Sequence, residues 1–477
     1  MCETLKNKAL KGILWNAVDR FSSQGISFLV SIMIARLLTP HDYGLVAMVG
    51  VFIAVAQTFV DSGFSSAIVR KVDRTEVDLS TAFYANVGIG ILCYLILYLL
   101  APYIACFYRE SELCAIVRAM GVIFFLFSFS NIQQAVLTIN VNFKTKTKIS
   151  LISVIISGLI GMFLAFVGFG VWALVYQQVV FALSKVILLW AFVKWRPLRA
   201  FSWNSFSTLF SFGSKMLLAG LLNSVFSNLY SIVIGKSLSS SYLGYYSRAE
   251  QFAQFPSTSI ANIIKGVSFP TMALIQNEEE RFNTNFYRIQ NVITFFSFPL
   301  IIGLAALSTP LIFVLLSEKW IYSARLLQII CFALMWYPVY SQNLNILEVK
   351  GFGNYILKSE IVSKTICVIA LFFLIPMGLE AVCWGQVFSN LLSVLISGYF
   401  VAKVTKSSYK RLFDAIKVNF VFALVMGMVC YMAQIPFPLP IIQLGVGILV
   451  GIITYFILNY LFNRSSLVMF YRLVFKK

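Results

Sequence analysis

Several charged side chains lie within long apolar stretches of this sequence, where a charge is costly. An Asp, Lys or Arg at the centre of a membrane-spanning helix costs about 2.5 to 3.5 kcal/mol on insertion scales. We expect most of these charges to face a wet cavity, although Lys185 and Lys364 could instead extend their amines to the membrane interface. The charges in or near apolar stretches are Asp19, Arg20, Asp61, Lys185, Arg248, Glu250, Lys265, Glu360 and Lys364.

The residue types indicate what such a cavity would bind. Arg20 and Arg248 lie deepest within their apolar stretches, and arginine can hold phosphate oxygens in bidentate fashion. We therefore predict a cationic cavity for a phosphorylated substrate made in the cytoplasm. The candidate substrate-binding residues are Arg20, Arg248, Gln251, Lys265, Lys185 and Lys364. The candidates for ion coupling, or for holding the arginines in place, are Asp19, Asp61 and Glu250.

Polar residues recur at helical spacing beside these charges. Asn16, Arg20, Ser23, Ser27 and Ser31 follow one another at steps of three and four, so a helix would place them on one face. Hydrocarbon offers such a stripe no hydrogen bonds, so it must face another helix or water. For the serines, hydrogen bonding between packed helices explains the stripe as well as a cavity does.

The sequence offers little for enzymatic chemistry. His41 is the only histidine and falls in a predicted loop, so we expect neither a His-ligated metal nor a histidine base. The eight cysteines have no CxxC spacing, and no G-x-x-x-x-G-K-[ST] motif occurs. We therefore expect a protein that is not an enzyme and that uses no cofactor or metal.

Membrane-spanning helices must position these residues. The chain of 477 residues is 60% hydrophobic and only 12% charged, and its mean hydropathy is +0.86. Its net charge of +19 favours cytoplasmic loops near anionic lipid headgroups over nucleic-acid binding. Hydropathy predicts fourteen helices, at 12–37, 43–67, 81–106, 117–139, 149–168, 171–193, 215–238, 243–271, 290–316, 323–347, 359–376, 380–402, 415–433 and 440–462.

The distribution of positive charge orients these helices. If the N-terminus is cytoplasmic, most of the 37 Lys and Arg residues fall in cytoplasmic segments, as the positive-inside rule requires. This indicates an even number of spans with both termini in the cytoplasm. The uncharged segment 201–213 is rich in aromatic residues, and it is either an interfacial helix or a linker.

An internal repeat organises the predicted helices. The residues Ser27, Leu29, Ser31, Ile32, Ile34, Leu38 and Gly44 recur 200 positions later as Ser227, Leu229, Ser231, Ile232, Ile234, Leu238 and Gly244. Farther along, Gly170 and Gln178 pair with Gly378 and Gln386 at an offset of 208. We predict an all-α polytopic protein with two parallel-repeat six-helix lobes, 1–200 and 201–405, and an extra two-helix segment with a cytoplasmic tail, 406–477. Like halves of this kind usually enclose a site and support alternating access.

Longer strings show a family resemblance. LKGILWNAVDRFSSQGISFLVSIMIARLLTPHDYGLVAM, DSGFSSAIVRK, GFGVWALVYQQ, LGYYSRAEQFAQFP and LLQIICFALMWYP resemble Wzx-type polysaccharide (O-antigen, capsule or exopolysaccharide) repeat-unit flippases. These belong to the multidrug/oligosaccharidyl-lipid/polysaccharide (MOP) exporter superfamily.

The resemblance carries expectations about function. It implies a central cationic cavity with Arg20 and Arg248 at the family's cationic positions. It also implies ion-coupled flipping of an undecaprenyl-diphosphate-linked oligosaccharide from the cytoplasmic to the outer leaflet of the bacterial plasma (inner) membrane. The product would serve surface polysaccharide or lipopolysaccharide synthesis, and a polysaccharide polymerase is a candidate partner.

Other functions remain open alternatives. A lipid II-type flippase or a small-molecule or drug exporter would belong to the same superfamily, and a drug exporter should have an acidic or aromatic cavity. A membrane glycosyltransferase or polymerase would need carboxylates on a substantial loop, and the sequence has no such loop. A structural scaffold would leave the buried charges unexplained.

Overall fold

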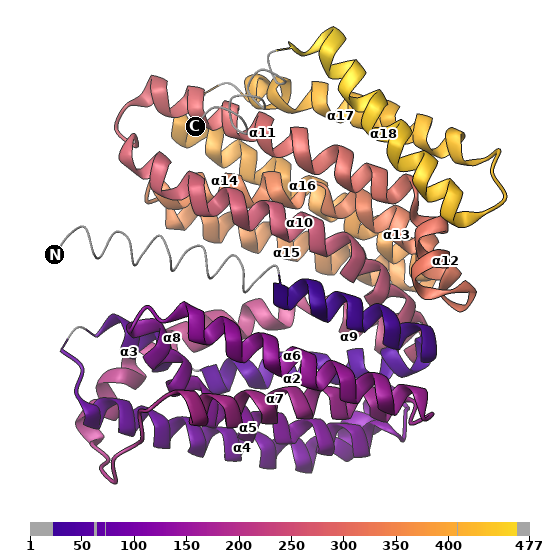
Figure 1. Ribbon diagram of the computed structural model, residues 1–477. Helices are drawn as coiled ribbons and strands as arrows, with labels where there is room; N and C mark the ends of the chain where they lie inside the picture. The colour runs from indigo at the N-terminus through magenta and orange to yellow at the C-terminus, as the bar shows by residue number, and fades with distance from the viewer. Residues whose placement is uncertain (1–21, 62–63, 72, 408, 465–477) are drawn as a thin grey trace. The chain divides into compact units, whose positions relative to one another are not determined.

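A computed structural model of the chain describes residues 22–61, 64–71, 73–407 and 409–464 (Figure 1). The described residues are mostly helical, and none of them forms a strand. They fall into two compact units, Met1–Gly244 and Tyr245–Lys477.

The helices of the first unit cover the sequence up to the start of α10. They are the described part of the first helix, Ser22–Leu37, then α2 (Pro40–Asp61), α3 (Phe64–Arg70), α4 (Glu76–Tyr108), α5 (Leu113–Ile139), α6 (Phe143–Phe166), α7 (Val171–Phe192), α8 (Trp203–Ser227), α9 (Leu229–Ser237) and the first turn of α10 (Ser240–Leu274). Within this unit α4 packs on α5, α5 on α7, and α7 on α6.

The second unit holds the remainder of α10 and the helices that follow. These are α11 (Glu279–Ala306), α12 (Ser308–Leu316), the short η1 (Glu318–Trp320), α13 (Ile321–Leu334), α14 (Tyr337–Val349), α15 (Gly353–Leu374), the short η2 (Ile375–Met377), α16 (Leu379–Thr405), α17 (Tyr409–Gln434) and α18 (Pro440–Phe462). The α17–α18 pair packs against α11 and α12, and α15 packs against α16.

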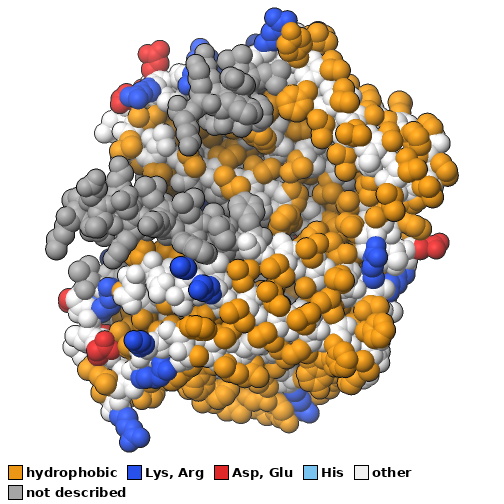
Figure 2. Space-filling model, in the orientation of Figure 1, with side chains coloured by type: hydrophobic (Ala, Val, Ile, Leu, Met, Phe, Trp, Pro, Cys, Tyr) orange, Lys and Arg blue, Asp and Glu red, His pale blue; other side chains and the backbone are white. Residues whose placement is uncertain are grey.

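The predicted all-α polytopic fold is confirmed. In the part of the chain that the structure describes, eleven helical segments are long and apolar enough to cross a membrane. The first helix is described only from Ser22, and α8 and α10 are long but rich in polar side chains. The number of fourteen spans therefore stays a prediction. Hydrophobic side chains cover much of the described surface in Figure 2, as expected of a protein in contact with lipid.

The segment 201–213 opens a helix, so the interpretation as a simple linker is wrong. The Ser202 hydroxyl accepts a hydrogen bond from Ser205 N at 3.3 Å and caps α8. Phe206 and Phe210 then pack against Phe64 of α3, with ring centroids 5.9 and 6.4 Å away. Helices α8 and α9 thus pack within the first unit, and the division into lobes at residue 200 stays a prediction.

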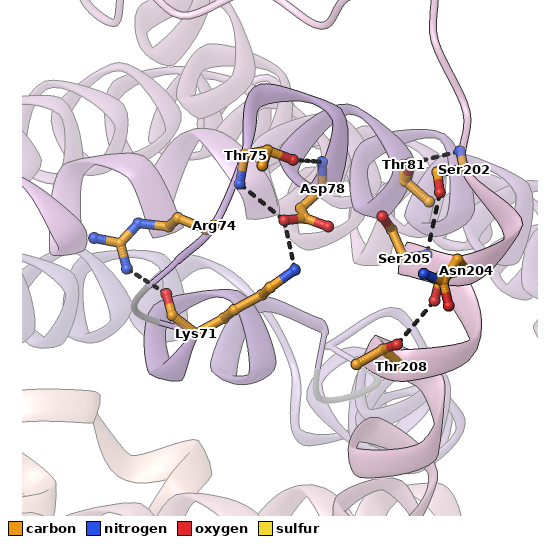
Figure 3. A network of polar contacts seen from close by, with 9 residues as sticks. All are labelled: Lys71, Arg74, Thr75, Asp78, Thr81, Ser202, Asn204, Ser205 and Thr208. Carbon is orange, nitrogen blue, oxygen red and sulfur yellow. Dashed lines mark hydrogen bonds and ion pairs between the residues drawn. The ribbon is translucent and has the colours of Figure 1, made fainter.

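The start of α4 fixes the turn that precedes it (Figure 3). Thr75 and Asp78 form a capping box, in which Thr75 N donates to Asp78 Oδ2 at 2.8 Å and Asp78 N donates to Thr75 Oγ1 at 3.2 Å. The same Asp78 oxygen accepts a charge-assisted hydrogen bond from Lys71 Nζ at 2.7 Å.

The first turns of α4 also hold the connection between α7 and α8. Leu198 N donates to Ser80 Oγ at 2.9 Å, and Ser202 N donates to Thr81 Oγ1 at 3.1 Å. The Trp195 indole donates to Glu76 Oε2 at 2.8 Å. Side chains of α4 therefore satisfy two backbone N–H groups and one indole N–H of a loop that has no regular structure of its own.

Replacing Asp78 with alanine is expected to lower the melting temperature of the purified protein. The Asp78 side chain is only 2% exposed, and its loss leaves Thr75 N and Lys71 without their acceptor. Unsatisfied buried groups of this kind cost about 1–3 kcal/mol. The control is Asp73→Ala, which removes an exposed carboxylate from the same turn. Equal melting temperatures for both variants would show that the Asp78 network does not stabilise the fold.

The first turns of α2 and α10 meet at two glycines. A Cβ atom on Gly44 would lie 1.7 Å from the carbonyl oxygen of Ser240, and one on Gly244 would lie 1.8 Å from that of Pro40. The contact is reciprocal, because each glycine faces the residue that opens the other helix. These two glycines are counterparts in the sequence repeat. Only glycine permits such a close backbone approach.

The single histidine belongs to this contact, so its predicted placement in a loop is wrong. His41 lies in the first turn of α2. Its Nδ1 is 3.3 Å from Ser240 Oγ, and that hydroxyl donates to Glu110 Oε1 at 2.7 Å. The serine stands between the histidine and the carboxylate, whereas a nucleophilic triad needs the histidine in the middle.

Candidate functional site

The first unit contains a cavity of about 940 Å³ between α2, α3, α5 and α7. This volume is typical of small-molecule sites. The lining residues are Gly50, Ile53, Ala54 and Gln57 of α2, Ser65, Ser66, Val69 and Arg70 of α3, Phe127, Asn131, Gln134, Ala135 and Thr138 of α5, and Gln178 and Lys185 of α7.

The lining is cationic and rich in carboxamides. Arg70 and Lys185 supply positive charge, and the lining residues that the structure describes include no carboxylate. The carboxamides of Gln57, Gln134 and Gln178 can each donate and accept hydrogen bonds. Together these groups suit an anionic ligand that also carries many hydroxyl groups.

Helical spacing brings the α5 residues to the cavity. Phe127, Asn131, Gln134 and Thr138 follow one another at steps of four, three and four, so they share one face of α5. Asn131 Nδ2 donates to the carbonyl oxygen of Val60 at 3.2 Å, and this bond ties α5 to α2. The polar stripe of α5 therefore both packs against its neighbour and lines the cavity.

Two aromatic rings position the amine of Lys185. Its Nζ lies 5.9 Å from the centroid of Phe127 and 5.8 Å from that of Phe181. Both distances fall within the range in which a ring attracts a cation. The two rings thereby hold the amine at the cavity.

A smaller hollow of about 340 Å³ adjoins the cavity and shares Ile53, Phe127 and Gln178 with it. Ser27 of the first helix lines this hollow. Ser23, one turn earlier, instead shares a hydrogen bond of 3.1 Å with Ser150 of α6. Both interpretations of the serine stripe thus apply, because one serine faces a hollow and the other joins two helices.

The lysines predicted in the second unit each have an acidic neighbour. Lys265 Nζ lies 3.0 Å from Glu348 Oε2, and both side chains are about half exposed. Lys364 Nζ lies 2.7 Å from Glu360 Oε2. Tyr340 also donates to that glutamate at 2.7 Å. Such pairing lowers the net charge that either lysine offers to an anion.

Residues on α10 form a second polar cluster in this unit. The Tyr246 hydroxyl donates to Glu250 Oε1 at 3.1 Å and lies 3.4 Å from Gln386 Oε1 of α16. Arg248 and Gln251 are half-buried on the same helix. The roles predicted for Arg248, Glu250 and Gln251 stay predictions.

Three predicted site residues cannot be placed. Asp19 and Arg20 lie outside the described residues, and so does the side chain of Asp61. Their predicted roles in substrate binding and in coupling or charge pairing therefore stay predictions.

Our sequence reasoning missed most of the cavity residues. Gln57, Gln134 and Thr138 carry no charge, and Arg70 lies in a basic stretch that the positive-inside rule places at the cytoplasmic side. Gln178 was noted only as part of the repeat. The helical spacing of Asn131, Gln134 and Thr138 is the pattern that would have indicated a polar face.

Solved structures show which fold the chain adopts. The fold is similar to that of the lipid II flippase MurJ in an inward closed conformation, with a TM-score of 0.77 and 16% identity over 95% of this chain and 100% of that chain. It is also similar to an inward-facing multidrug resistance MATE transporter of the MOP superfamily, with a TM-score of 0.65 and 16% identity over 83% of this chain and 99% of that chain. The protein therefore has the multi-pass helical fold of MOP superfamily transporters.

Sequence comparison assigns the family. The sequence profile of the polysaccharide biosynthesis protein family matches residues 33–325, more than half of the chain, so the protein belongs to that family. It is 26% identical to the teichuronic acid biosynthesis protein TuaB of Bacillus subtilis (strain 168), over 90% of this chain and 89% of TuaB. It is 25% identical to the lipopolysaccharide biosynthesis protein WzxC of Escherichia coli (strain K12), over 69% of this chain and 67% of WzxC. The resemblance to Wzx-type flippases is confirmed.

Proposed function

We propose that the protein flips an undecaprenyl-diphosphate-linked oligosaccharide from the cytoplasmic to the outer leaflet of the bacterial plasma membrane. The observation that carries this proposal is the first-unit cavity, with two cations, several carboxamides and no carboxylate among its described lining residues. Cations match a diphosphate, and carboxamides match sugar hydroxyls. The related succinoglycan biosynthesis transport protein ExoT of Rhizobium meliloti (strain 1021), 26% identical over 68% of this chain and 66% of ExoT, supports a transport role.

The proposed mechanism is ion-coupled alternating access by a transporter that is not itself an enzyme. Two repeat halves, 1–200 and 201–405, would alternate, with 406–477 as an additional segment. Both termini would be cytoplasmic, as the distribution of Lys and Arg predicts. A polysaccharide polymerase would use the product. A drug exporter is disfavoured, because an organic cation has little to bind in a lining of this charge.

Complementation of a strain that lacks its own flippase tests the proposal. Surface polysaccharide should be restored, and the lipid-linked precursor should no longer accumulate. Arg20→Ala and Arg248→Ala should each abolish the surface glycan, because a diphosphate loses a bidentate partner, whereas Arg→Lys should rescue only in part.

The control is Arg288→Ala, which removes an exposed arginine of α11. All variants should reach the membrane in equal amounts. Full activity of the Arg20→Ala/Arg248→Ala double variant would remove both arginines from the mechanism. Failure of the unmodified protein to restore glycan from several different repeat units would count against a lipid-linked oligosaccharide as substrate.

A further inference from the structure

Two lysines from different helices converge on one tyrosine ring in the second unit. Lys358 Nζ of α15 lies 5.9 Å from the centroid of Tyr355, and Lys403 Nζ of α16 lies 5.5 Å from it. Two like charges gathered around one ring repel each other, and a bound anion would relieve that repulsion. Neither lysine forms an ion pair with an acidic residue in the part of the chain that the structure describes.

The ring that holds the lysines is firmly packed. Tyr355 stacks on Phe352 and Phe400, with centroids 5.6 and 5.1 Å away and interplanar angles of 15° and 21°. Tyr355 and Phe400 also pack against a buried core that includes Phe282 and Leu347. The lysine pair is therefore anchored on a rigid platform, which reduces the ordering that binding an anion would require.

An apolar surface begins directly beside this lysine pair. Leu357 and Ile361, which flank Lys358 along α15, are 61% and 56% exposed. On α16, Tyr399 is 60% exposed near Lys403. In the span that begins at Gly353, only 11% of the most apolar stretch is buried, so most of α15 is an exposed apolar surface. The lysines thus lie at the end of this surface, on the side predicted to be cytoplasmic.

We propose that Lys358 and Lys403 bind the headgroup phosphate of an anionic glycerophospholipid whose acyl chains lie against α15. Basic residues at the cytoplasmic ends of membrane helices recognise such headgroups. The phosphate would bridge the two amines and join α15 to α16. A soluble phosphate compound would satisfy the amines but would gain nothing from Leu357 and Ile361.

The test compares the melting temperature of the full-length protein in nanodiscs of phosphatidylcholine alone and with added phosphatidylglycerol. Phosphatidylglycerol should raise the melting temperature of the unmodified protein. The Lys358→Gln/Lys403→Gln variant should lose most of this rise, because two lysines together change lipid affinity about 30-fold. The control, Lys146→Gln/Lys148→Gln, removes the same charge from the start of α6 and should keep the rise.

Three outcomes would overturn the proposal. The first is an equal rise in the Lys358→Gln/Lys403→Gln variant, and the second is an equal loss in the control. The third is a rise of the same size when inorganic phosphate is added to phosphatidylcholine nanodiscs, which would indicate a soluble ligand. Should the variant unfold in phosphatidylcholine, Lys358→Arg/Lys403→Arg keeps the charges, and native mass spectrometry then counts the phosphatidylglycerol bound. A lower count of bound phosphatidylglycerol on that variant than on the unmodified protein would equally contradict a headgroup site.

Discussion

Alanine at Gly44 or at Gly244 is expected to prevent the protein from accumulating in its folded form. The new methyl group would lie 1.7 or 1.8 Å from a carbonyl oxygen of the facing helix. Because the obstructing atoms are backbone, no side-chain rotation can relieve the overlap, and the first turns of α2 and α10 must separate. Overpacking of well-packed sites typically costs about 1–3 kcal/mol, and a backbone clash should exceed that range. Size-exclusion chromatography of the detergent-extracted protein measures the loss.

The same helix supplies a matched control for this prediction. Gly266 of α10 has open space where a Cβ would lie, so Gly266→Ala should leave the yield and the melting temperature unchanged. Separation of the helices should also break the hydrogen bond from Ser240 to Glu110. Normal yield and stability of Gly44→Ala would show that the two helices do not meet as closely as the structure places them.

Methionine at Lys185 is expected to reduce surface polysaccharide about 10- to 100-fold. Methionine keeps an unbranched apolar chain against Phe127 and Phe181 but removes the charge that the cavity would offer to a phosphate. A hydrogen bond to a charged group contributes about 1.5–3 kcal/mol, which corresponds to this range. The measurement is complementation of a flippase-deficient strain, with the amount of protein in the membrane determined in parallel.

Two further variants separate charge from packing at this position. Lys185→Arg keeps the charge and should retain most activity, and Lys194→Met removes an exposed charge just after α7 and should be neutral. Wild-type polysaccharide with Lys185→Met would exclude a role for this amine in transport. It would leave the carboxamides, Gln57, Gln134 and Gln178, as the remaining candidates in the cavity.

Local pattern was sufficient to predict the helices, because a helix depends on residues that are near in sequence. Where the structure describes them, the fourteen predicted ranges fall mainly on helix, and the range 81–106 lies within α4, which extends from Glu76 to Tyr108. The ranges 215–238, 290–316 and 323–347 each cover two helices with a short break between them. The sequence pattern was misleading at His41. The polar stretch around it resembles a loop, but Thr39 N donates a hydrogen bond to Asp42 Oδ2 and α2 begins at Pro40.

Charge alone predicted only part of the lining of the candidate cavity. Lys185 does line a cavity, but Lys265 and Lys364 lie beside Glu348 and Glu360. Glu348 is 83 residues from Lys265 in sequence, so no local pattern could indicate that pair. The uncharged Gln57 and Gln134 escaped notice, because a glutamine within a helix looks the same whether it faces a cavity or a neighbouring helix.

The sequence by itself determined that this is a helical membrane protein with a repeat and an excess of positive charge. Hydropathy, periodicity, net charge and self-similarity can all be read from residue types and their order, without knowing which helices touch. Only the tertiary structure decided which polar side chains share a cavity, which lysines have an acidic neighbour, and why Gly44 and Gly244 must both be glycine. Those properties depend on contacts between helices that are distant in sequence, and packing sets these contacts through the shapes of whole helix surfaces.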